Sequence, residues 1–111
     1  MGLKMREKND LPECPIATTV SLVGSKWKLL IIRNLMNRDW KFNELLKSID
    51  GISQKVLTDN LRQLESDGII YRKDYKTNPP RVEYGMTNLG KKLSKMLDVM
   101  TEFGNFYKTQ I

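Results

Sequence analysis

Histidine is absent from this chain of 111 residues, and cysteine occurs once. Without histidine the chain lacks the usual general base, the usual partner of a catalytic serine or cysteine, and the commonest zinc ligand. A single cysteine forms neither an internal disulfide nor a thiolate metal cage. The sequence has no glycine-rich phosphate loop. We therefore expect no catalytic residue, no metal and no cofactor, and an enzyme working through Asp, Glu, Lys or Tyr alone is the weakest alternative.

Long apolar runs are also missing. The longest, LLII at 29–32, is far too short to cross a bilayer and is expected as a buried helix segment. The N-terminus, MGLKMREKND, is charged and lacks the apolar stretch of a secretory signal. A myristoylation signal would need Ser or Thr where Arg6 stands. We therefore expect a cytoplasmic protein with no membrane partner.

The composition suits one folded domain with a basic surface. Apolar residues make up 40% of the chain, which suffices for one modest core. The net charge of +6 favours a polyanionic partner. However, residues 53–87 hold six basic and five acidic side chains, so their charge is nearly balanced. Charge alone therefore supports nucleic-acid binding without establishing it.

The pattern of caps and breakers predicts a polar arm over 1–13 and a single domain over 14–111. Pro15 is suited to the first position of a helix, so Cys14 is the expected N-cap, and Gly24 ends that helix. Ser25 is expected to cap a second helix reaching residue 37. A very short strand fits around Trp40. Asn43 is the expected cap of a short third helix.

A helix-turn-helix followed by a hairpin is the central expectation. After a turn at residues 50–51, Ser53 should cap a longer helix that stops at Gly68. Residues 69–75 and 81–87 are rich in β-branched and aromatic side chains and predict two strands. Thr87 or Asn88 should cap one last helix to the C-terminus. The predicted fold is α+β and mostly helical: a winged helix-turn-helix domain with N- and C-terminal dimerisation helices.

The helix from Ser53 to Asp67 separates into two faces. Leu57, Leu61 and Leu64 recur at spacings of four and three and should lie on the core. The opposite face carries side chains that can contact bases or phosphates in a major groove. An ordinary solvated polar face is the alternative. The candidate DNA-binding residues of this helix are Ser53, Gln54, Lys55, Thr58, Asp59 and Arg62.

The hairpin is a candidate wing. Lys73, Lys76 and Arg81 lie at or near its tip, where cations can reach phosphates or the minor groove. A hairpin kept soluble by its charges is the alternative. Because the helix and the hairpin occur in the order that a winged helix requires, together they favour double-stranded DNA as the partner.

The last helix carries an apolar seam. Its residues step by four and three along the chain, as in a coiled coil. The seam could cover the domain's own core, but so small a domain cannot easily bury all of it, which favours a homodimer reading a pseudo-palindromic operator. The seam comprises Leu89, Leu93, Met96, Met100, Phe103 and Tyr107, widened by Leu97, Val99 and Phe106.

Cys14 is the one chemically soft side chain. At a helix N-cap the helix dipole favours a thiolate, which is the reactive form of cysteine. Glu13 and Asp10 oppose this effect. Cys14 is therefore a possible sensor, and the alternative is a small, partly buried and inert thiol.

The chain resembles the HxlR-type winged-helix regulators, relatives of the broader MarR group. The resemblance rests on the segments 14–16 (CPI), 24–27 (GSKW), 42–45 (FNEL), 52–58 (ISQKVLT), 61–68 (LRQLESDG), 80–84 (PRVEY) and 89–90 (LG). It implies a dimeric DNA-binding regulator in which the helix from Ser53 reads the groove and Arg81 belongs to the wing. It also implies that the first helix, with Ile16, joins the last helix at the dimer interface.

In several members of that family the N-terminal cysteine senses electrophiles or oxidants, and the resemblance carries this role to Cys14. The chain departs from the family pattern at two positions. Arg38 stands where the family often has Gly, and Lys41 where it often has Arg. A winged-helix module that binds protein instead of DNA remains the main alternative function.

Overall fold

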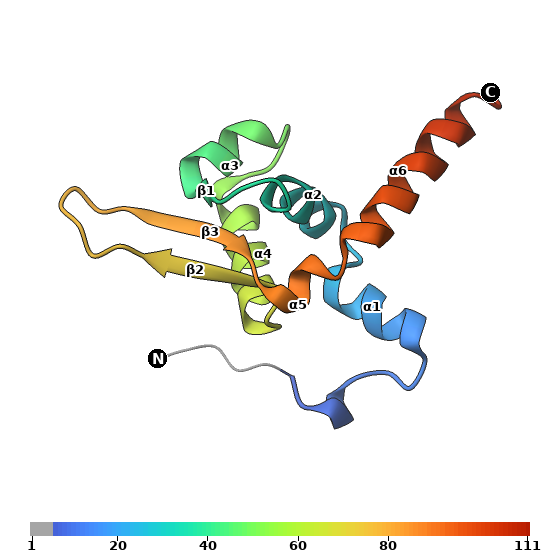
Figure 1. Ribbon diagram of the computed structural model, residues 1–111, viewed down its shortest axis with the longest axis horizontal. Helices are drawn as coiled ribbons and strands as arrows, with labels where there is room; N and C mark the ends of the chain where they lie inside the picture. Colours follow the sequence, from blue (N-terminus) through green and yellow to red (C-terminus); the bar gives the residue numbers. More distant parts are fainter. Residues whose placement is uncertain (1–5) are drawn as a thin grey trace.

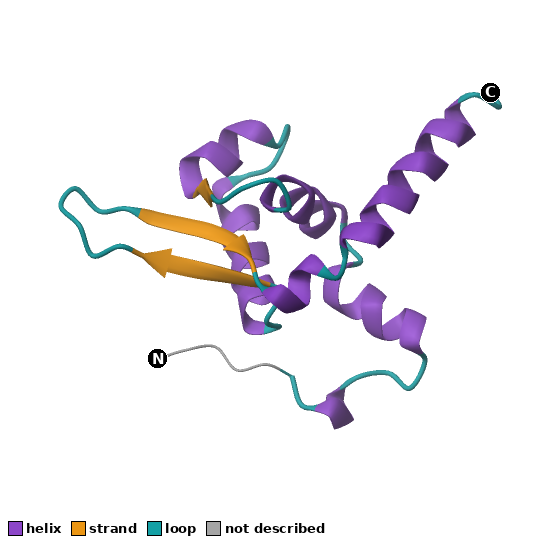
Figure 2. Ribbon diagram, in the orientation of Figure 1, coloured by secondary structure: helices purple, strands orange, loops and turns teal. Residues whose placement is uncertain are grey.

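The computed structural model describes residues 6–111, so the first five residues of the arm predicted over 1–13 lie outside the described part. The helices gather around a small sheet, a long hairpin extends from one side, and the last helix projects from the other (Figures 1 and 2). The elements are η1 (Lys8–Asp10), α1 (Pro15–Val23), α2 (Lys26–Leu35), β1 (Trp40–Lys41), α3 (Phe42–Ser48), α4 (Gln54–Ser66), β2 (Ile70–Asp74), β3 (Val82–Met86), α5 (Asn88–Lys91) and α6 (Ser94–Lys108).

Helix starts follow the predicted caps in three places. Cys14 is the N-cap of α1, with Pro15 at the first helical position. The Ser25 hydroxyl accepts a hydrogen bond from the Lys28 amide at 3.1 Å, and α2 then ends at Leu35, two residues before the predicted end. The Ser53 hydroxyl accepts from the Val56 amide at 3.1 Å and so begins α4. Each oxygen satisfies an amide that the helix itself leaves unpaired.

The third helix begins earlier than predicted, and the role given to Asn43 is wrong. α3 starts at Phe42, and its N-cap is Lys41. The Lys41 amide donates to the Glu44 carboxylate at 2.8 Å, which lowers the pKa of Glu44. Because this carboxylate reaches back to the cap amide, the first turn closes one residue ahead of Asn43.

The predicted final helix is divided in two. The Thr87 hydroxyl accepts from the Gly90 amide at 3.0 Å and donates to the Gly68 carbonyl at 2.6 Å. These bonds cap the short α5 and hold it against the loop that follows α4. The Leu93 amide then bonds the Gly90 carbonyl three residues back, and this tighter turn separates α5 from α6. Leu89 therefore lies on a different helix from the rest of the predicted seam.

The sheet is antiparallel in the order β1-β3-β2. Trp40 pairs with Tyr84, and Tyr71 pairs with Gly85. Only the base of the β2–β3 hairpin is buried, at Ile70, Gly85 and Met86. The remainder extends into solvent directly after α4 (Figure 1), so the predicted helix-turn-helix and wing are confirmed.

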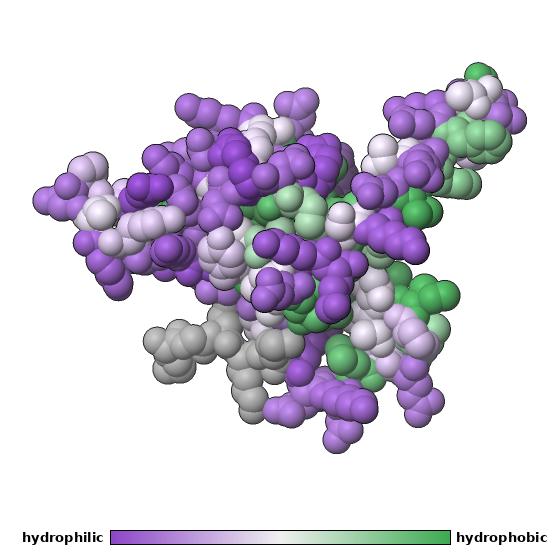
Figure 3. Space-filling view, viewed as in Figure 1, coloured by the Kyte–Doolittle hydropathy of each residue, from purple (hydrophilic) through white to green (hydrophobic). Residues whose placement is uncertain are grey.

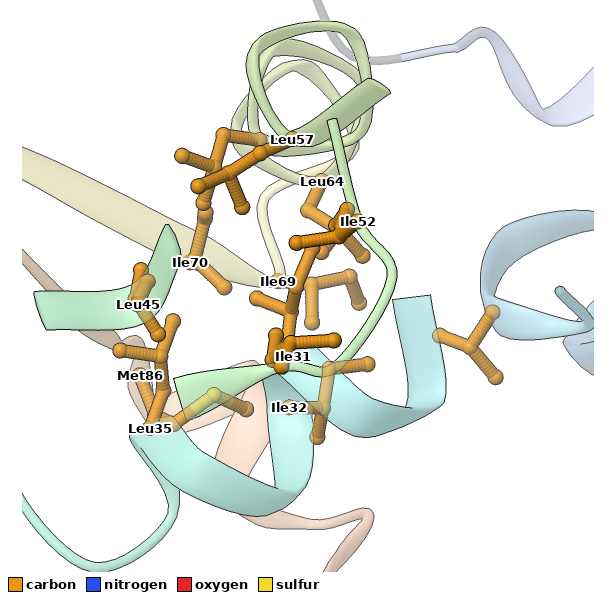
Figure 4. Close-up of a cluster of buried hydrophobic side chains, with 13 residues drawn as sticks. Ile31, Ile32, Leu35, Leu45, Ile52, Leu57, Leu64, Ile69, Ile70 and Met86 are labelled. Carbon is orange, nitrogen blue, oxygen red and sulfur yellow. The ribbon is translucent and has the colours of Figure 1, made fainter. Parts of the chain in front are cut away.

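The core lies between α2, α3, α4 and the base of the hairpin (Figure 4). The predicted stripe of α4 is confirmed, because Leu57, Leu61 and Leu64 are all buried. They meet Ile31 of α2 and side chains from the loop and strand that follow α4. This packing fixes the rotation of α4 about its axis, and therefore decides which of its residues face outward.

Glycine is required at residue 85 because side-chain atoms of Asp39 and Tyr71 lie where a Cβ atom would stand. The Tyr71 hydroxyl donates to the Asp39 carboxylate at 2.6 Å, and this hydrogen bond raises the pKa of Tyr71 to about 12. A Cβ atom at Gly85 would overlap both partners of that bond. We expect Gly85→Ala to lower the free energy of unfolding by about 1–3 kcal/mol in urea denaturation. In a Tyr71→Ala background the same change should cost much less, because the ring is gone and the Asp39 carboxylate, released from its hydrogen bond, can turn away. An equal cost in both backgrounds would contradict this account.

Candidate nucleic-acid interface

The outward face of α4 carries the predicted base-contacting residues. Ser53, Gln54, Lys55 and Arg62 are exposed, while Thr58 and Asp59 are half-buried. This face is opposite the leucine stripe, as predicted. Whether any of these side chains contacts DNA stays a prediction.

Several of these side chains are already engaged within the protein. Lys55 Nζ lies 2.7 Å from the Asp59 carboxylate, one helical turn away. The Thr58 hydroxyl donates to the Gln54 carbonyl at 2.9 Å, and Ser53 is occupied as the N-cap. An exposed pair such as Lys55–Asp59 is weak and can open for a phosphate. Within residues 6–111, no hydrogen bond or ion pair involves the side chain of Gln54 or Arg62.

The wing cations are paired more fully than expected. Arg81 Nη2 lies 3.1 Å from Glu83 Oε2, and Lys76 Nζ lies 3.7 Å from Asp74 Oδ2. The Lys76 amide also donates to Asp74 at 2.8 Å, which lowers the pKa of that carboxyl group. Two of the three predicted wing cations, Lys76 and Arg81, are therefore balanced by carboxylates of the wing itself.

An aromatic ring organises the same part of the wing. Lys73 Nζ lies 4.7 Å from the centre of the Tyr75 ring, and the Arg81 guanidinium lies 4.3 Å from it. The Tyr75 hydroxyl donates to Glu83 at 3.1 Å. The ring thus holds two cations in place at the start of the hairpin loop.

Arg72 is a candidate that sequence reasoning missed. It lines a groove of about 440 Å³ between α4 and the sheet, together with Arg62, Thr58, Tyr84 and three other residues (Phe42, Leu61 and Glu65). Arg72 is exposed, and within the described residues no carboxylate lies within ion-pair distance of it. The signal was available, because strand alternation places Arg72 on the same face as the buried Ile70, which packs toward α4.

The turn before α3 accommodates Arg38 without a left-handed residue. The Arg38 guanidinium lies 3.8 Å from the centre of the Trp40 ring and donates to the Asp39 carbonyl at 2.8 Å. It also reaches Glu44 at 3.4 Å. Arg38 is therefore engaged with the entry to α3.

The predicted seam divides into two parts. Leu93, Met96 and Leu97 are half-buried against the domain's own core. Beyond them α6 leaves the body, and its apolar side chains are uncovered (Figure 3). On α1, Ile16 and Val20 are also uncovered, with Ile16 75% exposed. The exposed large apolar residues of α6 are Val99, Met100, Phe103, Phe106 and Tyr107.

Cys14 is an exposed free thiol at the N-cap of α1, as predicted. Its side chain makes no capping hydrogen bond. The backbone around it is held by Thr18, whose hydroxyl donates to the carbonyls of Pro12 at 2.9 Å and Cys14 at 3.1 Å. The reactivity of Cys14 stays a prediction.

Over residues 6–111, no helix is both long and apolar enough to cross a membrane. In the same range, no three cysteine, aspartate or glutamate side chains are grouped so that they could hold a metal ion.

Comparison with known sequences gives consistent matches. The sequence model of the HxlR-like helix-turn-helix family matches residues 22–111. The chain is 40% identical over 103 residues to YdeP of Bacillus subtilis, an uncharacterised HTH-type transcriptional regulator, covering 93% of this chain and 80% of that protein. It is also 40% identical over 94 residues to an uncharacterised HTH-type transcriptional regulator of Methanothermobacter thermautotrophicus, covering 85% and 72%.

Solved structures show the same fold. The redox regulator HypR in its reduced form matches with a TM-score of 0.82 and 35% identity, covering 86% of this chain and 94% of that one. The diamide-treated YodB of Bacillus subtilis matches with a TM-score of 0.71 and 33% identity, covering 85% and 94%.

Proposed function

Because this chain belongs to the HxlR-like helix-turn-helix family of transcriptional regulators, we propose that it is a cytoplasmic homodimer that binds a specific DNA operator. Proteins of this family regulate transcription and are not enzymes. The observation that carries the proposal is the arrangement of α4 and the hairpin. α4 buries its leucines and turns a polar face outward, while the hairpin projects beside it (Figure 1).

In this proposal α4 enters a major groove and the wing reaches the neighbouring backbone or minor groove. Gln54 is suited to a bidentate contact with adenine, because its amide both donates and accepts. Lys55 and Thr58 lie beside it on the first turns of α4. Ser53 lies at the helix N-terminus, where free amides favour phosphate. The wing residues Lys73, Lys76 and Arg81 contact phosphates, and Asp59 holds Lys55 until DNA arrives.

Arg62 and Arg72 are proposed to hold one DNA phosphate between them. A backbone that passes from the groove filled by α4 to the wing must cross the space that separates these two elements. That space is the groove lined by Arg62 and Arg72, with the Thr58 hydroxyl in its wall. Neither guanidinium has a carboxylate partner in the described chain, so neither must break an ion pair to bind phosphate.

The uncovered apolar side chains support the homodimer. Ile16 on α1 and Met100, Phe103 and Tyr107 on α6 would be covered by the same residues of a second copy, and Leu93 and Met96 would continue the interface toward the body. A two-fold dimer places its two reading helices about 34 Å apart, which matches successive major grooves on a pseudo-palindromic operator.

The phosphate assignment predicts how DNA binding responds to salt. Arg62→Ala and Arg72→Ala should each weaken operator binding by about fivefold and lower the salt slope by about one unit. The measurement is a mobility-shift titration over several salt concentrations, on DNA selected from a random pool. Lys55→Ala should also weaken binding, but by less than the two arginine variants, because DNA must first open the 2.7 Å ion pair between Lys55 and Asp59.

Both alanine variants should keep the parent's denaturation midpoint, since the two arginines are exposed. If both bind operator as the parent does, the groove between α4 and the wing holds no phosphate. If the parent enriches no DNA from the pool, the proposed function itself is wrong.

A thiol-based response is proposed as the regulatory input. HypR is a redox regulator, and YodB has been studied after treatment with diamide. Both are similar to this chain in sequence and fold, which supports a response of this chain to thiol-reactive or oxidising signals through Cys14.

A protein-binding winged helix is the second candidate function. The observation in its favour is the pairing of Lys76 and Arg81 with neighbouring carboxylates, which balances the charge of these two wing cations. Salt separates the two functions, because DNA binding through several phosphates must weaken steeply as salt rises.

A further inference from the structure

Arg6 joins the N-terminal arm to the far end of the helix proposed to read DNA. Its Nε lies 3.0 Å from Asp67 Oδ1, and its Nη2 lies 3.1 Å from Asp67 Oδ2. The same Nη2 donates to the Ser21 carbonyl of α1 at 3.1 Å. One guanidinium therefore connects the arm, α1 and the end of α4. We call this set of contacts the Arg6 clasp.

Asp67 is an unusual partner because its carboxylate is almost completely buried. Asp67 is the C-cap of α4, and its side chain is 4% exposed. Within residues 6–111 its carboxylate oxygens accept hydrogen bonds from Arg6 alone. Lys28 of α2 is buried nearby, and burial lowers its pKa while the charge of Asp67 opposes that effect. A buried carboxylate is tolerated only when it is paired, so Asp67 depends on Arg6.

The clasp holds a part of the molecule that packing holds weakly. Beneath it lies an apolar cavity of about 330 Å³, lined by Leu11 of the arm, by Leu22 of α1 and by Leu93 at the start of α6. Since this space is not filled by side chains, the hydrogen bonds of Arg6 add a restraint on α1 relative to the end of α4 that nonpolar contact does not supply there.

We propose that Arg6 is a positioning residue that fixes the angle between α1 and α4, and thereby the spacing of the two reading helices in the dimer. The inference rests on the proposed function, in which α1 contributes to the dimer interface and α4 enters the major groove. A change of angle at the clasp alters where the second α4 meets the DNA, without altering how one α4 meets its own half-site. Arg6 lies outside the family-matched segment 22–111.

The experiment compares operators that differ only in the separation of their half-sites. The parent protein first selects an operator from a random DNA pool, and the operator is then remade with one base pair inserted or removed at its centre. One base pair rotates the second half-site by about 34°, and the parent should lose about tenfold in affinity. Arg6→Ala should bind the original operator about tenfold more weakly and lose less than about threefold on respacing.

A half-site fragment separates positioning from a purely structural role. Parent and Arg6→Ala should bind it equally, because one α4 is unchanged. Arg6→Ala/Asp67→Asn also removes the unpaired buried carboxylate, so it should regain thermal stability and still tolerate respaced operators. Lys8→Ala removes a cation from the same arm and should behave as the parent.

Two results would overturn the inference. In the first, Arg6→Ala loses as much affinity as the parent, about tenfold, when one base pair is inserted or removed between the half-sites. In the second, Arg6→Ala/Asp67→Asn recovers both the parent's stability and its preference for the original half-site spacing. The Arg6 clasp would then contribute to folding stability and not to positioning. A parent that binds full and half operators equally would instead refute two-half-site reading, and the inference would fall with it.

Discussion

Phe103→Asp is expected to convert the proposed dimer into monomers and to weaken operator binding on the order of 100-fold. Phe103 is 65% exposed on the projecting part of α6, and its ring centre lies 6.3 Å from that of Tyr107. A charge placed in the apolar interface that these rings would form has no partner, and its desolvation opposes association. The loss of the dimer removes the second half-site contact, so each α4 must bind DNA alone. Met100→Asp should act in the same way.

Sedimentation velocity measures the mass of each variant, and a mobility shift on the full operator measures the affinity. Asn105→Asp is the matched control, since residue 105 is exposed on the other side of α6 and keeps its size on substitution. It should remain a dimer with the parent's affinity. If the Phe103→Asp protein still sediments as a dimer, the exposed face of α6 is not the interface.

Treatment with diamide or a quinone is expected to weaken operator binding by about tenfold or more in the parent and to leave Cys14→Ser unaffected. The physical basis is the position of Cys14, which is exposed at the N-cap of α1 and whose side chain makes no capping hydrogen bond. With no second cysteine in the chain, oxidation must join Cys14 to a second copy, join it to a small thiol, or add oxygen to its sulfur, and diamide is reduced to its hydrazine as a disulfide forms. A quinone instead adds directly to the Cys14 thiolate and leaves a thioether. Each product adds bulk where Thr18 holds the backbone of Pro12 and Cys14.

The effect on DNA follows from the place of α1. If α1 is part of the dimer interface, displacing the N-terminus of α1 changes the separation of the two α4 helices. A small rotation of one subunit relative to the other then removes one α4 from its groove. Mass spectrometry identifies the product, and a reductant should restore binding where the product is a disulfide. Equal loss of binding in the parent and in Cys14→Ser would remove the sensor role from Cys14.

Some features of the fold were predictable because they depend on neighbours in the chain. The caps at Cys14, Ser25 and Ser53 and the leucine stripe of α4 follow from local hydrogen bonding and from helical periodicity. The same local reasoning was wrong at Asn43, although the signal was present. Glu44 lies three residues after Lys41, and a carboxylate at that spacing competes for the start of the helix.

The sequence predicted which residues of the helix and the hairpin belong to the candidate site. It did not predict how their side chains pair on the folded surface. Periodicity indicated that Gln54 and Arg62 face outward, and strand alternation could have placed Arg72 near them. The pairing of Arg81 with Glu83 and the packing of Lys73 against Tyr75 depend on side-chain conformation. Which cations remain available for a phosphate is therefore a property of the folded wing.

The sequence by itself determined the order of the elements, the buried stripe of α4, the hairpin after it and the family, because each depends on short-range pattern. Only the tertiary structure decided the rest. It held α5 against the loop that follows α4, because Thr87 bonds the Gly68 carbonyl 19 residues away. It also brought Arg6 to Asp67 across 61 residues of chain. Contacts at such separations arise from the packing of whole elements, and no local pattern of residues specifies them.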